Sequence, residues 1–147
     1  MAAKIDISKL LSQISAFGHD ANRLAVAVTN STTQGMVTQA QLRAVVGLSG
    51  QLRLSLGKTT ARVGFNKSFF FANAPYAAYV EFGTGGTVSI PKGFEEMASK
   101  FKGKGIRKIN LKPRPFFIPS YLEGIQQYPK DLRKVLEVQT RKYNAKK

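Results

Sequence analysis

The chain has no cysteine, no tryptophan, one histidine and only eight acidic side chains among its 147 residues. The missing cysteine excludes disulfide bonds, thiolate metal sites and cysteine nucleophiles. The N-terminus lacks the continuous apolar core of a signal peptide, and no segment approaches the roughly 18 apolar residues that span a bilayer. We therefore expect a soluble protein that is made and used on the cytoplasmic side of its host.

The scarcity of titratable groups also argues against catalysis. His19 falls on the polar side of the first predicted helix and has no sequence partner that would make it a general base. The acids are dispersed, and the adjacent Glu95 and Glu96 would diverge on a helix, so no zinc or calcium ligand spacing is present. Glycines at 83–86 and 103–105 do not match the phosphate-loop pattern. The sequence predicts no enzyme, no metal ion and no cofactor.

What the chain does have is positive charge, unevenly placed. The formal net charge is +15; residues 1–91 carry 8 basic and 3 acidic side chains (+5), and residues 92–147 carry 15 and 5 (+10). Such a field attracts nucleic acid, acidic lipid headgroups or an acidic protein surface. Motifs for reading bases are absent, so the attraction to nucleic acid would be independent of base sequence.

Two long stretches have the apolar spacing of an amphipathic helix. Residues 6–46 predict one long helix, kinked or frayed near residues 32–35, or two helices in line, because that part is rich in poor helix formers. The second stretch begins near Pro119 and keeps one face to residue 139, with a kink or break expected at Pro129. Residues 141–147 predict a frayed basic tail.

Shorter elements are expected between these helices. Residues 50–56 fit a helical turn that places Leu52 and Leu56 on the core, or a short strand. Alternation over 58–65 predicts a strand with its turn at 66–67, and residues 87–90 a brief one. Pro75 and Gly83 bracket a two-turn helix, and Phe94 begins the pattern of a shorter one.

The element order predicts a single α+β domain over residues 1–147. It would comprise a long N-terminal helix, a small antiparallel sheet with a short helix, and a C-terminal helix. Residues 92–112 are glycine- and lysine-rich and predict a basic, mobile loop.

Glu81 is the acid whose setting calls for an explanation. It lies among Tyr79, Val80 and Phe82, where a buried carboxylate must be paired or hydrogen-bonded. Arg114 is the candidate partner, since a guanidinium holds a carboxylate in a bidentate grip. A solvent-facing Glu81 is the alternative.

Two aromatic clusters exceed what one regular element can bury on one side. Three consecutive aromatics point around any helix or strand, and prolines on both sides stiffen the second cluster. Some of these rings are therefore predicted to meet another subunit, although packing within the chain is expected for most. The candidates are Phe69, Phe70, Phe71, Phe116 and Phe117.

Basic side chains cluster in the predicted loop. A solvated surface is one interpretation, and contact with DNA phosphates or an acidic partner is the other. The candidate contacts are Lys92, Lys100, Lys102, Lys104, Arg107, Lys108 and Lys112.

Several blocks in this order resemble one protein family. They are GQLRLSL at 50–56, a strand containing Val63 and Gly64, YAAYVEFGT at 76–84, and RPFFIP at 114–119 before a terminal helix. This arrangement is similar to the neck, or tail-completion, proteins of long-tailed bacteriophages, which join head to tail. The resemblance extends over about residues 5–140. Two features depart from it: the long basic stretch that follows Gly86, and the proline at 129 within the last helix.

The resemblance implies a non-enzymatic structural protein of the virion neck, assembled in the host cytoplasm. It implies a homo-oligomeric ring, six-fold in the expected form, around the channel for the genomic DNA. Its neighbours would be a head-closure or adaptor ring and a tail-terminator ring. The alternatives are a tail terminator or head-closure protein, or a sequence-nonspecific nucleic-acid-binding protein.

Overall fold

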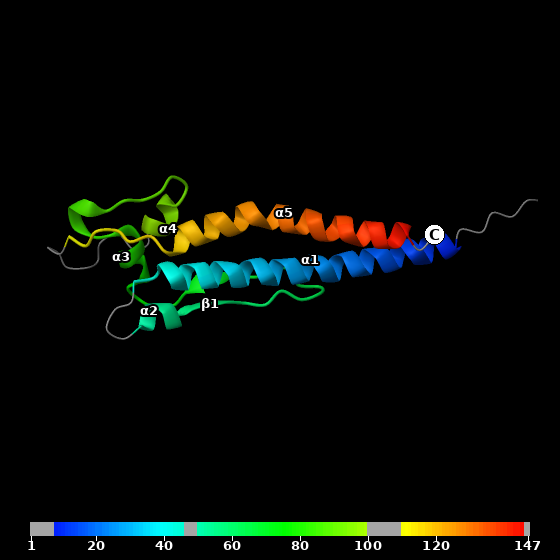
Figure 1. The fold of residues 1–147 in the computed structure, drawn as a ribbon. Helices are drawn as coiled ribbons and strands as arrows, with labels where there is room; N and C mark the ends of the chain where they lie inside the picture. Colours follow the sequence, from blue (N-terminus) through cyan, green and yellow to red (C-terminus); the bar gives the residue numbers. More distant parts are fainter. Residues whose placement is uncertain (1–7, 46–49, 100–109, 146–147) are drawn as a thin grey trace, which may run out of the picture.

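The computed structural model describes residues 8–45, 50–99 and 110–145, with the side chains of residues 8–14 left aside. Its two long helices lie side by side and antiparallel, and the shorter elements gather at one end, which we call the head (Figure 1). The elements in chain order are α1 (Ser8–Arg43), α2 (Gln51–Leu54), β1 (Leu56–Lys58), β2 (Phe70–Ala72), α3 (Ala77–Phe82), the 3-10 turn η1 (Gly85–Thr87), α4 (Glu95–Ser99) and α5 (Phe117–Asn144). The predicted α+β class is confirmed, with a long first helix, a small antiparallel sheet and a long last helix.

Helix α1 is continuous through the threonine-rich stretch, where the sequence predicts one helix with a kink or fray, or two helices in line. Threonine hydroxyls there hydrogen-bond back to the preceding turn: Thr29 Oγ1 donates to the carbonyl of Ala25 at 2.9 Å, and Thr33 Oγ1 to that of Thr29 at 2.8 Å. Thr33 is buried as well. A hydroxyl satisfied in this way does not compete for the helical backbone, so the poor helix formers are tolerated.

The small sheet pairs β1 with β2 antiparallel, Gly57 opposite Phe71. It is joined to α1 by Asn30, whose side chain donates to the carbonyl of Ala61 at 2.9 Å and accepts from its N–H at 2.8 Å. Helix α1 thus lies between this hairpin and α5 (Figure 1). The main core is at the head and contains Val37, Ala40, Ala44, Leu52, Leu56, Ala77 and Phe116.

Polar and aromatic contacts hold α5 along α1. Tyr128 Oη lies 3.2 Å from Thr29 Oγ1, and at the end away from the head Tyr143 Oη donates to Asp20 Oδ2 at 2.9 Å. Near the head, a Cβ at Gly124 would overlap the side chain of Met36. The glycine therefore lets the two helices approach closely at that point.

Several local predictions need correction. The strand predicted over 58–65 does not form, because β1 ends at Lys58. The tight turn is not at 66–67 but between Arg62 and Phe65, which form an isolated bridge. Residues 50–56 contain both candidate structures in succession, a helical turn and then the start of β1, and Leu52 and Leu56 are buried as predicted. Residues 87–90 form no strand: Thr87 is the last residue of η1, and residues 88–90 belong to no helix or strand.

The helix predictions fared better. The two-turn helix after Pro75 is α3, and the short helix after Phe94 is α4. Helix α5 begins two residues before Pro119 and is unbroken at Pro129, where a kink or break is predicted. It continues through Asn144, so residues 141–144 are helical and not the predicted frayed tail.

Candidate functional site: a clasp at the base of the basic segment

The carboxylate of Glu81 holds the start of α5. Helix α3 presents this side chain to the interior, where it is only 5% exposed. Oε2 accepts hydrogen bonds from the backbone N–H groups of Phe116 at 2.7 Å and Phe117 at 2.8 Å, and Oε1 accepts from Ile118 at 2.9 Å. The first amides of a helix have no carbonyl partner within it, and its N-terminus carries partial positive charge. Glu81 therefore caps α5 from another part of the chain.

The predicted ion pair between Glu81 and Arg114 was wrong. In the described residues no ion pair joins them; the Arg114 side chain is exposed, and its backbone N–H donates to the carbonyl of Val80 at 2.8 Å. Glu81 is buried, as the first interpretation predicted, and does not face solvent, but its partners are backbone amides and not Arg114. Three amides fixed by the helix satisfy the charge without taking a guanidinium out of water. Pro119 indicated a helix start nearby, but a proline in the first helical position would place the free amides after it, not at 116–118.

Further hydrogen bonds extend this contact along the chain. The N–H of Thr84 donates to the carbonyl of Leu111 at 2.9 Å, and the N–H of Leu111 returns to Thr84 Oγ1 at 2.9 Å. Thr87 Oγ1 donates to the same carbonyl at 2.7 Å, and the N–H of Gly86 donates to Asn110 Oδ1 at 3.1 Å. We call the hydrogen-bonded contacts between residues 80–87 and 110–118 the clasp.

Two glycines make the clasp possible. Gly83 has φ +78° and Gly85 has φ +63°, a region that other residues rarely adopt. A Cβ at Gly83 would lie 2.6 Å from the carbonyl oxygen of Leu111, and one at Gly85 would overlap the side chain of Asn110. The sequence Gly-Thr-Gly is thus accounted for by a close approach of two backbones, in agreement with the absence of a phosphate-loop pattern.

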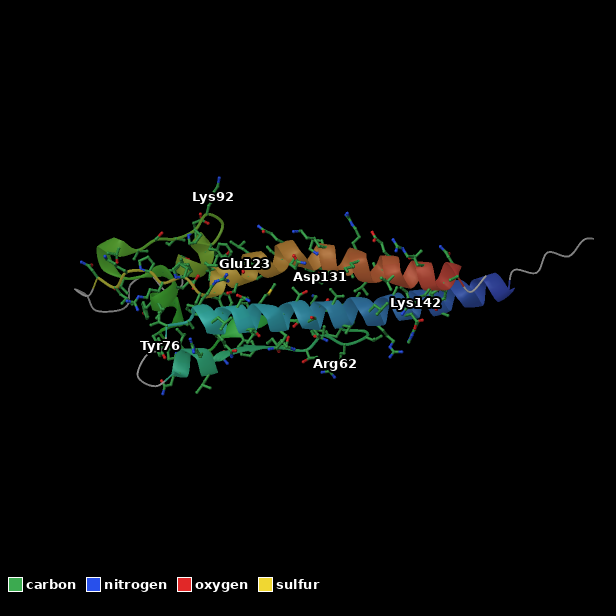
Figure 2. All side chains as sticks on the ribbon, in the orientation of Figure 1. Arg62, Tyr76, Lys92, Glu123, Asp131 and Lys142 are labelled. Atoms are coloured by element: carbon green, nitrogen blue, oxygen red, sulfur yellow. The ribbon has the colours of Figure 1, made fainter. Side chains whose placement is uncertain are left out.

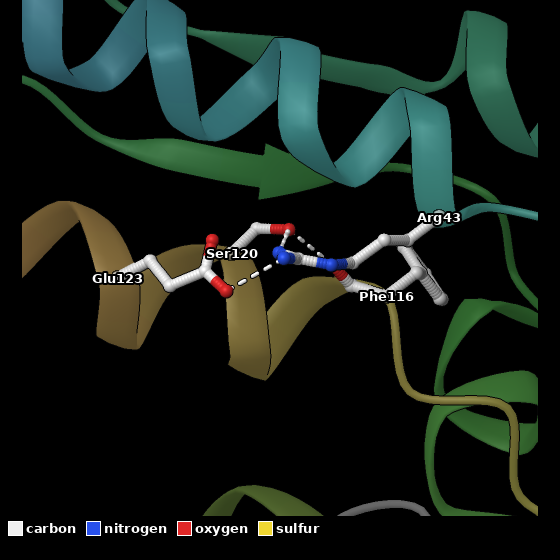
Figure 3. Close-up of polar contacts among 4 residues, drawn as sticks. All are labelled: Arg43, Phe116, Ser120 and Glu123. Carbon is white, nitrogen blue, oxygen red and sulfur yellow. Dashed lines mark hydrogen bonds and ion pairs between the residues drawn. The ribbon is translucent and has the colours of Figure 1, made fainter.

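A second contact ties α1 to the same helix start (Figure 3). Arg43 Nη1 donates to Ser120 Oγ at 2.9 Å, and Nη2 pairs with Glu123 Oε1 at 2.6 Å. Ser120 Oγ in turn donates to the carbonyl of Phe116 at 2.7 Å. The first turn of α5 is therefore held by α3 through Glu81 and by α1 through Arg43. Sequence reasoning missed the Arg43 contact, because the two partners lie 77 and 80 residues away.

The clasp lies at the base of the basic segment, by which we mean residues 92–112. Lys92 and Lys112 are both exposed, and Lys92 projects at the head (Figure 2). The other predicted contacts, Lys100, Lys102, Lys104, Arg107 and Lys108, lie outside the described residues. The described chain leaves the clasp after Thr87 and returns to it at Asn110.

The predicted aromatic interface needs correction. Phe116 is 1% exposed within the single chain and belongs to its core. Phe70 and Phe117 stack on each other with ring centroids 4.1 Å apart, and Phe71 is half-buried with its ring over Gly57. These rings are largely used inside the chain because β2 and the start of α5 pack together. Only Phe69, at 56%, is mostly exposed.

Four observations concern metal ligands, buried polar atoms, the histidine and membrane-spanning helices. They contain no group of three or more histidine, aspartate or glutamate side chains that could hold a metal ion. In the same residues every buried side-chain nitrogen and oxygen has a hydrogen-bond partner. His19 is exposed. None of the described helices is both long and apolar enough to cross a membrane.

Comparison with known proteins gives no relative: no family model, curated protein or solved structure matches this chain.

Proposed function

We propose that this protein is a structural component of the neck of a long-tailed bacteriophage, forming a ring that joins head to tail around the DNA channel. The single observation that carries the proposal is the clasp. Two of the sequence blocks that carry the family resemblance, at 76–84 and 114–119, form one hydrogen-bonded unit centred on Glu81. Their residue types are accounted for by packing and capping, as expected of a structural subunit.

The basic segment gives the proposed ring a contact with a polyanion. Lys92 and Lys112, the first and last residues of this segment, are exposed, and neither is in an ion pair among the described residues. A ring around a DNA channel presents such cations to phosphates, or to an acidic surface on an adjacent head-closure, adaptor or tail-terminator ring. The contact would be sequence-nonspecific and would weaken with salt.

The contact between ring subunits cannot use most of the five phenylalanines that the sequence suggested, because they are packed inside the chain. In a closed ring each subunit uses two different surfaces, one toward each neighbour. Phe69 remains available for such a contact, together with Val63 and Phe65 of the same hairpin, which are 52% and 50% exposed. We assign one of the two surfaces to this hairpin.

The test is electron microscopy of lysates from the encoding phage with this gene deleted, complemented by wild-type or variant copies. DNA-filled heads beside separate, finished tails would support a joining protein. Complementation should fail with Glu81→Ala and succeed with Glu123→Ala, which removes a carboxylate that is largely exposed.

Other outcomes would replace the proposal with a named alternative. Abnormally long tails would indicate a tail terminator, and heads that have lost their DNA a head-closure protein. Normal infectious particles would overturn a role in the neck and favour a sequence-nonspecific nucleic-acid-binding protein.

A further inference from the structure

The clasp uses the backbone of Arg114 but not its side chain. The N–H of Arg114 donates to the carbonyl of Val80 at 2.8 Å. Its guanidinium is exposed and has no ion pair or hydrogen bond among the described residues. Glu81, the carboxylate expected to pair with it, is satisfied by three backbone amides instead. The structure therefore holds Arg114 in place and leaves its charge without a counter-charge in the described part of the chain.

Lys112 is a second cation on the same segment. Its side chain is also exposed and is in no ion pair among the described residues. Residues 110–116, which lie at the head (Figure 1), contain no acidic residue. We call Lys112 and Arg114 the cation pair.

The clasp anchors the backbone on both sides of the cation pair. Leu111, just before it, exchanges two hydrogen bonds of 2.9 Å with Thr84. Phe116, just after it, donates its N–H to Glu81 Oε2 at 2.7 Å. Each cation thus lies within two residues of a fixed point of the backbone.

Prolines restrict the chain between these anchors. Pro113 separates the two cations and packs against Gly83, where an added Cβ would lie 3.0 Å from Cδ of the proline ring. Both cations directly precede a proline, and that position is restricted to extended backbone conformations. The cation pair therefore loses little backbone entropy when it binds a ligand, whereas a flexible basic loop loses more.

The spacing and the residue types fit phosphates on one strand of a nucleic acid. Two residues of extended chain span about 6–7 Å, comparable to the step between successive phosphates of a strand. Arginine binds a phosphate through two parallel N–H bonds, and lysine binds one as a point charge. A nucleic-acid backbone repeats its charges at a fixed interval, whereas carboxylates on a protein surface do not. Residues 110–115 include no aromatic side chain that could stack on an unpaired base, which favours a duplex.

From these observations we infer that Lys112 and Arg114 form a preorganised contact for two successive phosphates of duplex DNA, independent of base sequence. The inference rests on the proposed function, in which the ring surrounds DNA. It goes further by assigning the contact to two residues on a rigid part of the fold. One of them, Arg114, lies outside the basic segment.

The experiment uses the purified full chain and two short labelled duplexes of unrelated sequence. Fluorescence anisotropy measures the binding constant over a range of salt concentrations. Each phosphate contact contributes about 0.9 to the slope of the logarithm of the binding constant against the logarithm of salt concentration. Lys112→Ala with Arg114→Ala should therefore reduce the slope by about 1.8 for both duplexes.

The matched control is Arg62→Ala with Lys67→Ala, which also removes one exposed arginine and one exposed lysine. Arg62 lies along the helix pair, away from the head (Figure 2). The control should leave the slope unchanged within about 0.5. Circular dichroism checks that both double variants are folded.

A single substitution tests the arginine separately. Arg114→Lys keeps the positive charge but loses the planar fork that binds a phosphate through two bonds. It should leave the slope unchanged and weaken binding several-fold at every salt concentration.

Three results would overturn the inference. A slope reduced no more by the head variant than by the control would show that the cation pair does not contact phosphates. A loss confined to one duplex would show that bases are read. Poly-glutamate that binds more tightly than the duplexes, and is weakened by the same variant, would assign the pair to an acidic protein surface. The assay contains no phage, so its failure would leave the neck proposal standing.

Discussion

Removing the carboxylate of Glu81 should be among the most damaging single changes to this fold. Glu81→Ala takes the acceptor from three backbone amides, two of which, in Phe116 and Ile118, are buried. A hydrogen bond to a charged group contributes about 1.5–3 kcal/mol, and a buried amide left without an acceptor costs about 1–3 kcal/mol. The three bonds share one side chain, so their contributions do not simply add. We expect a loss of about 3–5 kcal/mol in the free energy of unfolding.

A second substitution tests the geometry of the cap. Glu81→Gln keeps one acceptor oxygen but replaces the other with an NH₂ group, which would face the amides as a donor. Because Oε2 accepts two of the bonds and Oε1 one, at least one of the three must be lost. We expect a smaller loss than for alanine, about 1–3 kcal/mol. A cavity of about 100 Å³ already adjoins Glu81, so the alanine variant also leaves the space less well filled.

Urea unfolding followed by far-UV circular dichroism measures these losses, provided that the slope with denaturant is unchanged. The control is Glu123→Ala, which breaks the ion pair with Arg43 at a side chain that is 56% exposed and should cost less than about 1 kcal/mol. If Glu81→Ala were no more destabilising than this control, the cap would contribute nothing beyond an ordinary surface pair, and the reasoning would be refuted.

Three further predictions concern the clasp and the helix pair. Gly83→Ala should destabilise the protein by about 1–3 kcal/mol in the same assay, because of its positive φ and the opposing backbone, whereas Gly86→Ala, with open space around it, should cost less. In a double-mutant cycle, Glu81→Ala and Arg114→Ala should be additive within about 0.5 kcal/mol, since they share no bond; strong coupling would revive the ion pair. The hydrogen bond to Asp20 on α1 raises the pKa of Tyr143. This hydrogen bond therefore contributes its full stabilisation of the folded state below the ordinary tyrosine pKa, and the stabilisation is lost as pH rises through the raised pKa. The stability difference between wild type and Tyr143→Phe should therefore vanish at alkaline pH in thermal unfolding, and a difference that persists there would contradict the assignment.

Much of the fold could be predicted from the sequence because periodicity reports which face of an element is buried. The long helices follow from their apolar spacing, and the Pro75 and Gly83 brackets locate α3. Strand limits could not be predicted in this way. The alternation after Lys58 is typical of a strand, but pairing partners determine where a strand ends, and β2 pairs with only three residues.

The sequence identified Glu81 as a residue of the site, but it did not identify the groups to which Glu81 is hydrogen-bonded. Spacing singled out Glu81 as an acid in need of a partner, yet it could not identify amides 35 to 37 residues away. A charged side chain was the natural candidate because side chains are visible in a sequence. Free backbone amides at a helix start are not, and Pro119 placed that start two residues too far along the chain. The buried Phe116 shows the same limit, since burial depends on which elements meet.

The distance along the chain between the contacts of α1 and α5 has a consequence for folding. Arg43 and Ser120 are 77 residues apart, and Asp20 and Tyr143 are 123 apart. Closing such long loops costs entropy before the helix pair gains any contact. We therefore expect the head to form first, with the clasp fixing where α5 begins. The helices would then zip together from the head outward, and refolding of Glu81→Ala should slow more than that of Tyr143→Phe.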